Sequence, residues 1–295
     1  MDFFVGEIMK LAVSIYNLSQ LNKRISYIDC AILNTKEYSL IYDESIDLQK
    51  AISICNRSNV TPIIAMNRMV HPNEIAYFES ELKKFIDSNV LFLITDIGLA
   101  NIAKRLNIIN RVIFDPQTMI TNKCDLALYS SFNFDALSMS LEFPLKDVIE
   151  SINEVNARLI YQIFGHRLMF YSKRSLISLY EEKANIKTSK NHLLLRESTR
   201  DDFIPVIENE NGTMMFRSYI ISLLKHKNEI DLLKYGYLES TYIDDSIFLK
   251  ALKIYSAVNK NEMELSEALK KLEELNLNIN DGFTYKDSVY QKEEF

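Results

Sequence analysis

The chain contains little cysteine, glycine or proline, and each shortage excludes a class of structure. Only 6 glycines and 5 prolines occur in 295 residues, so no low-complexity linker divides the chain. The three cysteines, Cys30, Cys55 and Cys124, lie far apart, and none belongs to a CxxC pair or a Cys/His cluster. A metal site with a familiar ligand spacing is therefore not expected. A small odd number of cysteines is typical of a reducing compartment.

Long apolar runs and an excess of basic residues are also missing. No stretch of about 18 uncharged apolar residues occurs, so we expect no membrane span. The N-terminal segment lacks the basic region and small-residue cleavage site of a signal peptide, which predicts a cytoplasmic protein. The net charge is −6, whereas a protein whose whole surface binds phosphates is normally basic. Any contact with nucleic acid must therefore use a local patch or a partner.

Apolar runs that suit strands alternate with helical segments along the first half of the chain. The expected strands are residues 11–15, 27–33, 60–66, 90–94, 111–114, 136–140 and 159–164. Regular alternation of strand and helix is the signature of a parallel sheet, and seven units in succession favour a closed barrel. We therefore predict an α/β fold, a distorted TIM-like (β/α) barrel that forms a single domain over residues 1–295.

The pattern changes after residue 180. Short strands at 192–196 and 204–207, a turn at 208–212 and a return strand at 213–216 predict an antiparallel hairpin excursion over residues 192–218. A last strand within 235–242 is expected to close the barrel. C-terminal helices and a tail then occupy residues 244–295.

One polar cluster stands out, directly after the apolar run that ends at Phe164. Gly165 is expected to end this strand. The cluster comprises His166, Arg167, Ser172, Lys173 and Arg174. In parallel α/β proteins, ligands are bound just past the C-terminal ends of strands, so the cluster predicts a cationic loop at a site. The alternatives are a half-buried histidine, an arginine paired with a carboxylate, and the solvated start of a helix.

Other polar residues follow the remaining predicted strands. Glu142, Asp96 and Asp115 are carboxylates at strand ends, where together they suit acid–base chemistry, whereas each taken alone is more typical of the N-cap of the next helix. The pair Asn67 and Arg68 has the same two interpretations. Cys30 and Cys55 fall on apolar faces and are expected in the core, and no GxGxxG, P-loop or HExxH motif occurs.

Several segments resemble one known family. The run IFGHRLMFYSKRSLISLY, residues 163–180, is similar to the signature segment of the collagenase-like peptidase family U32, and closest to its small Gram-positive branch. Residues 140–143 resemble the family's Ser-x-Glu at a strand end, and residues 203–216 its acidic turn before Gly-Thr. The closing DGFTYKDSVY is also similar to the C-terminal end of the small members.

The resemblance implies a distorted TIM barrel and a choice of functions. Several bacterial members act in hydroxylation, of the tRNA wobble uridine or of ubiquinone precursors, and they hold an iron–sulfur cluster on cysteines, two of them in the signature. This chain has no cysteine after Cys124, so it is not expected to hold a cluster by itself. In the Gram-positive branch a small and a larger member are paired in tRNA hydroxylation, and the small role suits this chain.

The first hypothesis is an accessory or small subunit in 5-hydroxyuridine formation at the tRNA wobble position. Its partner would be a larger, cysteine-bearing family member that carries any iron–sulfur cluster, and tRNA would be bound through the complex. The alternatives are a collagenase-like peptidase and a non-catalytic binding scaffold. We assign catalytic roles to Glu142 and His166. The expected substrate-binding residues are Asn67, Arg68, Asp96, Arg167, Ser172, Lys173 and Arg174.

Overall fold

The computed structural model describes residues 8–43, 46–188, 192–196, 198–199, 201–282 and 284. Eight parallel strands form a curled sheet in the order β6-β5-β4-β3-β2-β1-β11-β7. A parallel bridge between Leu137 and Leu159 joins β6 to the start of β7 and closes the ring. The strands are β1 (Lys10–Ile15), β2 (Cys30–Leu33), β3 (Thr61–Met66), β4 (Leu91–Ile94), β5 (Val112–Phe114), β6 (Ala136–Leu137), β7 (Ile160–Ser172) and β11 (Tyr235–Leu238).

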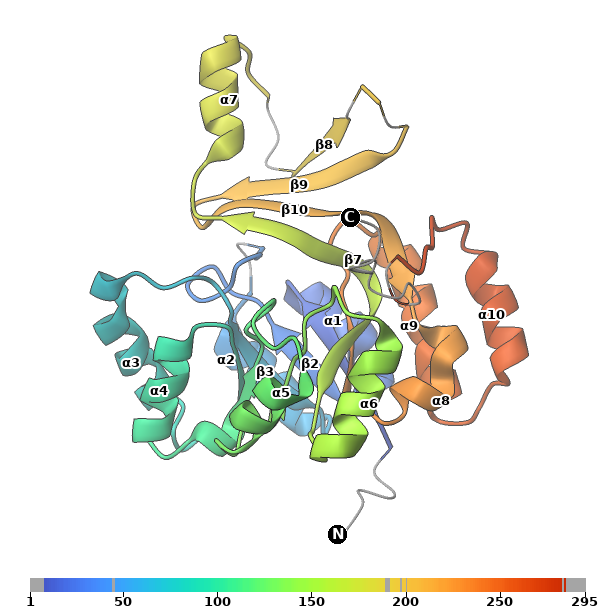
Figure 1. Cartoon of the computed structure of the whole chain (residues 1–295), viewed down its shortest axis with the longest axis horizontal. Coiled ribbons are helices and arrows are strands. Elements are labelled where there is room, and N and C mark those ends of the chain that lie inside the picture. The colour runs from blue at the N-terminus through green and yellow to red at the C-terminus, as the bar shows by residue number, and fades with distance from the viewer. Residues whose placement is uncertain are drawn as a thin grey trace, which may run out of the picture.

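Helices cover the outside of this ring (Figure 1). They are α1 (Leu18–Arg24), α2 (Leu48–Arg57), α3 (Ile75–Lys84), α4 (Ile97–Arg105), α5 (Lys123–Ser130), α6 (Leu145–Val155), α8 (Lys227–Ile230), α9 (Asp245–Asn259) and α10 (Leu265–Glu273). Outward-facing strand residues such as Val13, Ile64 and Phe114 pack against the buried faces of these helices. Within the described part of the chain, no helix combines the length and apolar character that crossing a membrane requires.

The interior of the ring is filled by the alternate residues of the same strands. They are Ala12, Cys30, Ile32, Ile63, Ala65, Leu93, Ile113, Ala136, Ile160 and Tyr235. Strands that are buried on both faces read as continuous apolar runs, which is why the sequence predicted them. The barrel prediction is confirmed, and Cys30 and Cys55 lie in the core as expected. The sixth strand is shorter than predicted and ends at Leu137.

The prediction that Gly165 ends a strand is wrong. The strand β7 continues to Ser172, and at Gly165 it leaves its parallel partner β11 and pairs with the antiparallel strand β10 (Gly212–Ser222). Gly165 has a φ of +112°, and a Cβ atom there would lie 2.2 Å from the carbonyl oxygen of Glu239. Only glycine fits this crossing. Consequently His166, Arg167 and Ser172 lie within a strand and not in a loop.

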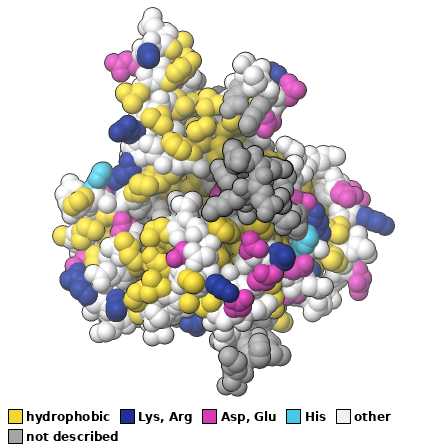
Figure 2. All heavy atoms as spheres, viewed as in Figure 1, with side chains coloured by type: hydrophobic (Ala, Val, Ile, Leu, Met, Phe, Trp, Pro, Cys, Tyr) yellow, Lys and Arg dark blue, Asp and Glu magenta, His cyan; other side chains and the backbone are white. Residues whose placement is uncertain are grey.

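Residues 165–222 form a projection, here called the arm. It consists of the second half of β7, α7 (Leu176–Ala184), β8 (His192–Arg196), β9 (Phe203–Asn209) and β10. The antiparallel strands predicted for residues 192–218 are confirmed, but the arm is larger because β7 contributes to it. Figure 1 shows the arm lying across one end of the barrel, and Figure 2 shows hydrophobic side chains gathered over it. The predicted C-terminal tail lies mostly outside the described residues.

Hydrogen bonds hold the arm over the C-terminal ends of the barrel strands. Asn209 Nδ2 donates to the carbonyl oxygen of Leu40, and Asn211 Nδ2 donates to that of Ser39, each at 3.0 Å. On other sides Lys173 Nζ donates to the Met69 carbonyl at 3.0 Å, and Arg167 Nη1 to the Leu141 carbonyl at 2.9 Å. These loops follow different strands, so the arm is fixed as a roof over the barrel mouth.

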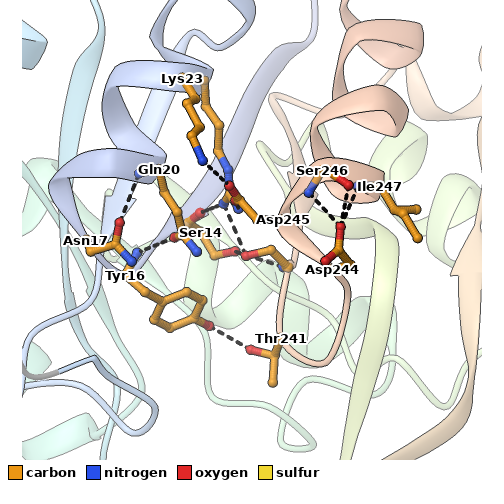
Figure 3. Close-up of polar contacts among 12 residues, drawn as sticks. Ser14, Tyr16, Asn17, Gln20, Lys23, Thr241, Asp244, Asp245, Ser246 and Ile247 are labelled. Carbon is orange, nitrogen blue, oxygen red and sulfur yellow. Dashed lines mark hydrogen bonds and ion pairs between the residues drawn. The ribbon is translucent and has the colours of Figure 1, made fainter.

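The ring is held at the β1–β11 seam by buried polar groups (Figure 3). Arg24 is fully buried, and its Nη1 donates to the Ser14 carbonyl at 2.7 Å and to Ser240 Oγ at 3.1 Å. Its Nη2 pairs with Asp245 Oδ1 at 2.6 Å. Burial lowers the pKa of Arg24, while Asp245 opposes the shift and keeps the guanidinium charged. A buried charge with several partners fixes the two strand ends in register.

We predict that Gly165→Ala lowers the free energy of unfolding by about 2 kcal/mol or more, because the new methyl group meets backbone and the residue needs a positive φ. This corresponds to a fall in Tm of about 3 °C or more, measurable by calorimetry. Gly98→Ala is the control, since its nearest neighbour is the movable Asp96 carboxylate. An unchanged Tm for Gly165→Ala would contradict the crossing described here.

Candidate functional site

A cavity of about 560 Å³ lies at the C-terminal face of the barrel, between the strand ends and the arm. Every barrel strand contributes a polar side chain to it, from within the strand for Gln162 of β7 and from the position just past the strand's C-terminal end for the others. In chain order these are Tyr16, Asn34, Asn67, Thr95, Asp115, Ser138, Gln162 and Glu239. Because parallel strands in register end at one level, these residues form the floor of the cavity.

The opposite wall is apolar and comes mostly from the arm. It is made by Leu40, Ile41, Met69, Leu168, Met169, Phe170, Tyr171 and Phe216. Phe216, Leu168 and Tyr171 belong to a small hydrophobic cluster beneath the arm. The cavity therefore joins a polar floor to an aromatic and aliphatic roof, a combination typical of pockets that orient an organic ligand.

Glu239 is the most heavily bonded group on the floor. Its carboxylate accepts hydrogen bonds from the Tyr16 hydroxyl at 2.8 Å, the Thr241 amide at 2.9 Å and the Tyr237 hydroxyl. Burial, and then the charge of Glu239, raises the pKa of both tyrosines. Both hydroxyls therefore stay protonated and donate, which holds the carboxylate in one orientation.

Asp115 and Thr95 lie beside each other on the floor. The Asp115 amide donates to the Ile94 carbonyl at 2.9 Å, and Ile94 pairs with Phe114 across β4 and β5. Burial raises the pKa of Asp115, against the hydrogen bonds from the Gln117 amide and from Ser138. Thr95 Oγ1 is buried and has no hydrogen-bond partner among the described residues. The Asp115 carboxylate, an acceptor, and the unsatisfied Thr95 hydroxyl are thus neighbours on the floor of the cavity.

The two predicted catalytic residues both line the cavity, and Arg217 connects them. Arg217 Nη2 contacts Glu142 Oε1 and Oε2 at 3.1 and 3.0 Å, and the backbone oxygen of Arg217 lies 2.8 Å from His166 Nδ1. Burial lowers the pKa of His166, which favours a neutral imidazole. Glu142 is at the rim, with about half of its side chain exposed. Their catalytic roles stay predictions.

Only Asn67 among the predicted substrate-binding residues lines the cavity. Arg68 pairs with Glu74 at 2.8 Å and lies over the ring of Phe78. Asp96 caps the start of α4 through the amides of Gly98 and Leu99, the alternative that the sequence left open.

The cationic segment after β7 also lies away from the floor. Lys173 bonds to the Met69 carbonyl, Ser172 Oγ accepts from the Arg174 amide, and Arg174 is exposed. Arg167 is 7% exposed and lies behind the cavity wall, with its guanidinium carbon 5.3 Å from the Tyr161 ring centroid. The structure therefore does not gather these cations into one anion site.

Sequence reasoning missed several floor residues, namely Tyr16, Asn34, Thr95, Ser138, Gln162 and Glu239. A usable signal existed for Tyr16, Asn34 and Thr95, which directly follow predicted strands, and at β4 the residue predicted was Asp96, one position past Thr95. Ser138 and Glu239 fell inside the segments predicted as strands, which end earlier in the structure, at Leu137 and Leu238. Gln162 carries no such signal, since it lies inside an apolar run.

The cysteines do not suit an iron–sulfur cluster. Cys30 lies inside the barrel and Cys55 on the buried face of α2, and burial raises the pKa of these thiols to about 12 and about 11. Cys124 is exposed at the start of α5, and none of the three lines the cavity. Within the described ranges, no group of three or more His, Cys, Asp or Glu is arranged to hold a metal ion. A cluster bound by cysteine thiolates does not fit these donors.

The fold and site define a (β/α)-barrel protein with a roofed cavity at the C-terminal face of the strands. The model of Peptidase family U32 matches residues 28–287, so the chain belongs to this family. The family predicted from the sequence is thereby confirmed. The chain is 21% identical over 267 residues to tRNA hydroxylation protein P2 of Bacillus subtilis (strain 168), covering 83% of this chain and 85% of that protein.

A solved structure supports the same fold. The U32 peptidase Mk0906 superposes with a TM-score of 0.52 at 12% sequence identity, covering 80% of this chain and 94% of the other. At that identity the likeness concerns the fold alone.

We predict that Asp115→Asn raises the free energy of unfolding at neutral pH. A carboxyl whose pKa is raised in the folded state opposes folding once it ionises, and asparagine removes this cost. The gain should narrow as the pH falls toward the ordinary aspartate value of about 3.9. Urea unfolding at pH 7.5 and pH 4.5 measures both, and a variant less stable than the native chain at pH 7.5 would contradict the prediction.

Proposed function

We propose that this chain is the small or accessory subunit in forming 5-hydroxyuridine at the wobble position of tRNA. The observation that carries the proposal is the likeness to tRNA hydroxylation protein P2, which spans 83% of this chain and 85% of that protein. Membership of peptidase family U32 supports it, since the resemblance implies hydroxylation in several bacterial members. The roofed cavity offers an enclosed place for a substrate.

The accessory role rests on the cysteine ligands that the chain lacks. The resemblance implies an iron–sulfur cluster on cysteines near the signature segment, and this chain has none beyond Cys124. We therefore assign any cluster to a larger, cysteine-bearing family member. Electrostatics supports the same division, because the net charge is −6 and the predicted cations Arg68 and Lys173 are both engaged by Glu74. A partner would then supply most of the contacts to the tRNA phosphates.

The alternatives receive less support. For a peptidase that uses Glu142, the structure offers no specific contact in favour among the described residues, since this carboxylate is paired with Arg217 at the rim of the cavity. A pure scaffold would not require a polar residue from every barrel strand around one cavity.

We assign contact with the larger partner to the arm, whose surface is unusually apolar (Figure 2). Half of the large hydrophobic side chains that are exposed among the described residues lie in it. Met169 and Phe170 line the cavity, and the surface that we assign to the partner is made by Leu179, Tyr180, Ile186, Leu194, Leu195 and Phe203. An apolar surface of this kind is typical of a protein–protein interface. The arm is also next to the cavity, so a partner bound there would reach the substrate.

Deleting the gene should remove 5-hydroxyuridine from hydrolysed tRNA, and a plasmid copy should restore it. Mass spectrometry of the nucleosides measures this directly. Unchanged 5-hydroxyuridine in the deletion strain, with no related gene taking over, would disprove the proposed function.

Leu179→Asp should weaken binding to the larger family member about tenfold, because it places a charge in the apolar surface of α7. The matched control is Leu128→Asp on α5, since the two leucines are similarly exposed, at 55% and 58%. Co-purification followed by titration calorimetry compares them. Equal affinity for both variants would place the interface elsewhere.

A further inference from the structure

We propose that the cavity of this chain itself receives a uracil base turned out of a single-stranded RNA segment, with Phe170 on its face and Thr95 and Asp115 on its edge. This inference rests on the proposed function and goes further, because it assigns base recognition to the small subunit and not to its partner. Proteins that modify a base take it out of the stack and hold it by stacking and by hydrogen bonds to its edge.

The roof supplies a stacking surface that the fold does not use. Phe170 lines the cavity, yet 40% of it is exposed and it lies outside the hydrophobic clusters. Its neighbours Leu168 and Tyr171 do pack into the cluster under the arm, together with Phe216. An exposed ring at the cavity wall is thus available to an aromatic ligand, and stacking of a base on such a ring is worth about 1–3 kcal/mol.

The floor supplies hydrogen-bonding groups that suit the edge of uracil. Thr95 Oγ1 is a buried donor with no partner among the described residues, and the carboxylate of Asp115 is a neighbouring acceptor. Uracil presents a carbonyl oxygen, O4, beside an N–H donor at N3. The hydroxyl would donate to O4 and the carboxylate would accept from N3–H. A buried hydroxyl without a partner is costly, so a ligand that bonds to it gains affinity.

The charges that line the cavity determine which part of a nucleotide enters it. The floor carries the carboxylates of Asp115 and Glu239, and the described cationic side chain on the cavity wall is that of Arg217, at the rim beside Glu142. Phosphate is repelled by such a floor, whereas an uncharged base is not. The cavity volume of about 560 Å³ lies in the usual range for small organic ligands, so a nucleoside fits.

The same groups discriminate between pyrimidines. Cytosine has a lone pair at N3 where uracil has a proton, so cytosine would set an acceptor against the Asp115 carboxylate. A methyl group on N3 of uracil removes the donor and adds bulk at the same point. A site that hydrogen-bonds one N–H rejects analogues that lack it.

The test is ligand-observed NMR titration of the purified chain with uridine, cytidine and 3-methyluridine. We expect uridine to bind about tenfold more tightly than either analogue, as expected for one hydrogen bond to a charged group. Asp115→Ala, which removes the acceptor, and Phe170→Ala should each weaken uridine binding to a similar extent. Asp87→Ala, the same substitution at an exposed position, should not. Failure to bind uridine, or equal binding of 3-methyluridine, would overturn the inference.

A complementation experiment separates this inference from the proposed function. The deletion strain is supplied with the native gene or with the Asp115→Ala, Phe170→Ala or Asp87→Ala variant, and 5-hydroxyuridine is measured in its tRNA. Loss of the nucleoside on deletion, with full restoration by both cavity variants, would overturn the inference and leave the proposed function standing. Low 5-hydroxyuridine with both cavity variants, together with full restoration by the native gene and by the Asp87 variant, would support the inference.

Discussion

The end of β11 is the point on which the rest of the structure depends, because one residue there serves both the barrel and the arm. The carboxylate of Glu239 accepts hydrogen bonds from Tyr16 on the β1 side and from Tyr237 on β11. Its carbonyl oxygen occupies the space where any side chain at Gly165 would lie. The buried contacts of Arg24 fix the same seam from the outside. Closure of the ring and departure of the arm are therefore set together.

This arrangement explains why the cavity is enclosed. A (β/α) barrel exposes its strand ends to solvent unless loops or inserted segments cover them. Here a barrel strand, β7, itself continues into the cover, and the Asn209 and Asn211 side chains hold the far end of the arm to the loop after β2. The polar floor and apolar roof are consequently joined by the strand β7 and by side-chain hydrogen bonds, an arrangement that suits recognition of a planar ligand with a hydrogen-bonding edge.

Much of the fold could be predicted from the sequence, and less of the site. Strands buried on both faces leave continuous apolar runs, so the barrel was visible before the structure was known. The course of β7 could not be predicted, because a glycine after an apolar run usually indicates a turn. The residue that Gly165 contacts, Glu239, is also distant in sequence. Likewise Arg68 and Lys173 looked available for a ligand, but Glu74, contributed by a separate turn, engages both. The pairing of Lys173 with Glu74 joins distant parts of the chain and leaves no local pattern, whereas the pairing of Arg68 spans six residues and depends on the turn at Pro72–Glu74.

The central claim is that the cavity under the arm is where this chain meets its ligand. Site-specific photo-crosslinking tests it most directly, with a photoreactive amino acid in place of Phe170 and the chain mixed with the proposed larger partner and an anticodon stem-loop. The account predicts a crosslink that maps to the wobble uridine, and none from the same group placed at Leu128. Crosslinks from position 170 that reach only the partner, or only the stem, would contradict it.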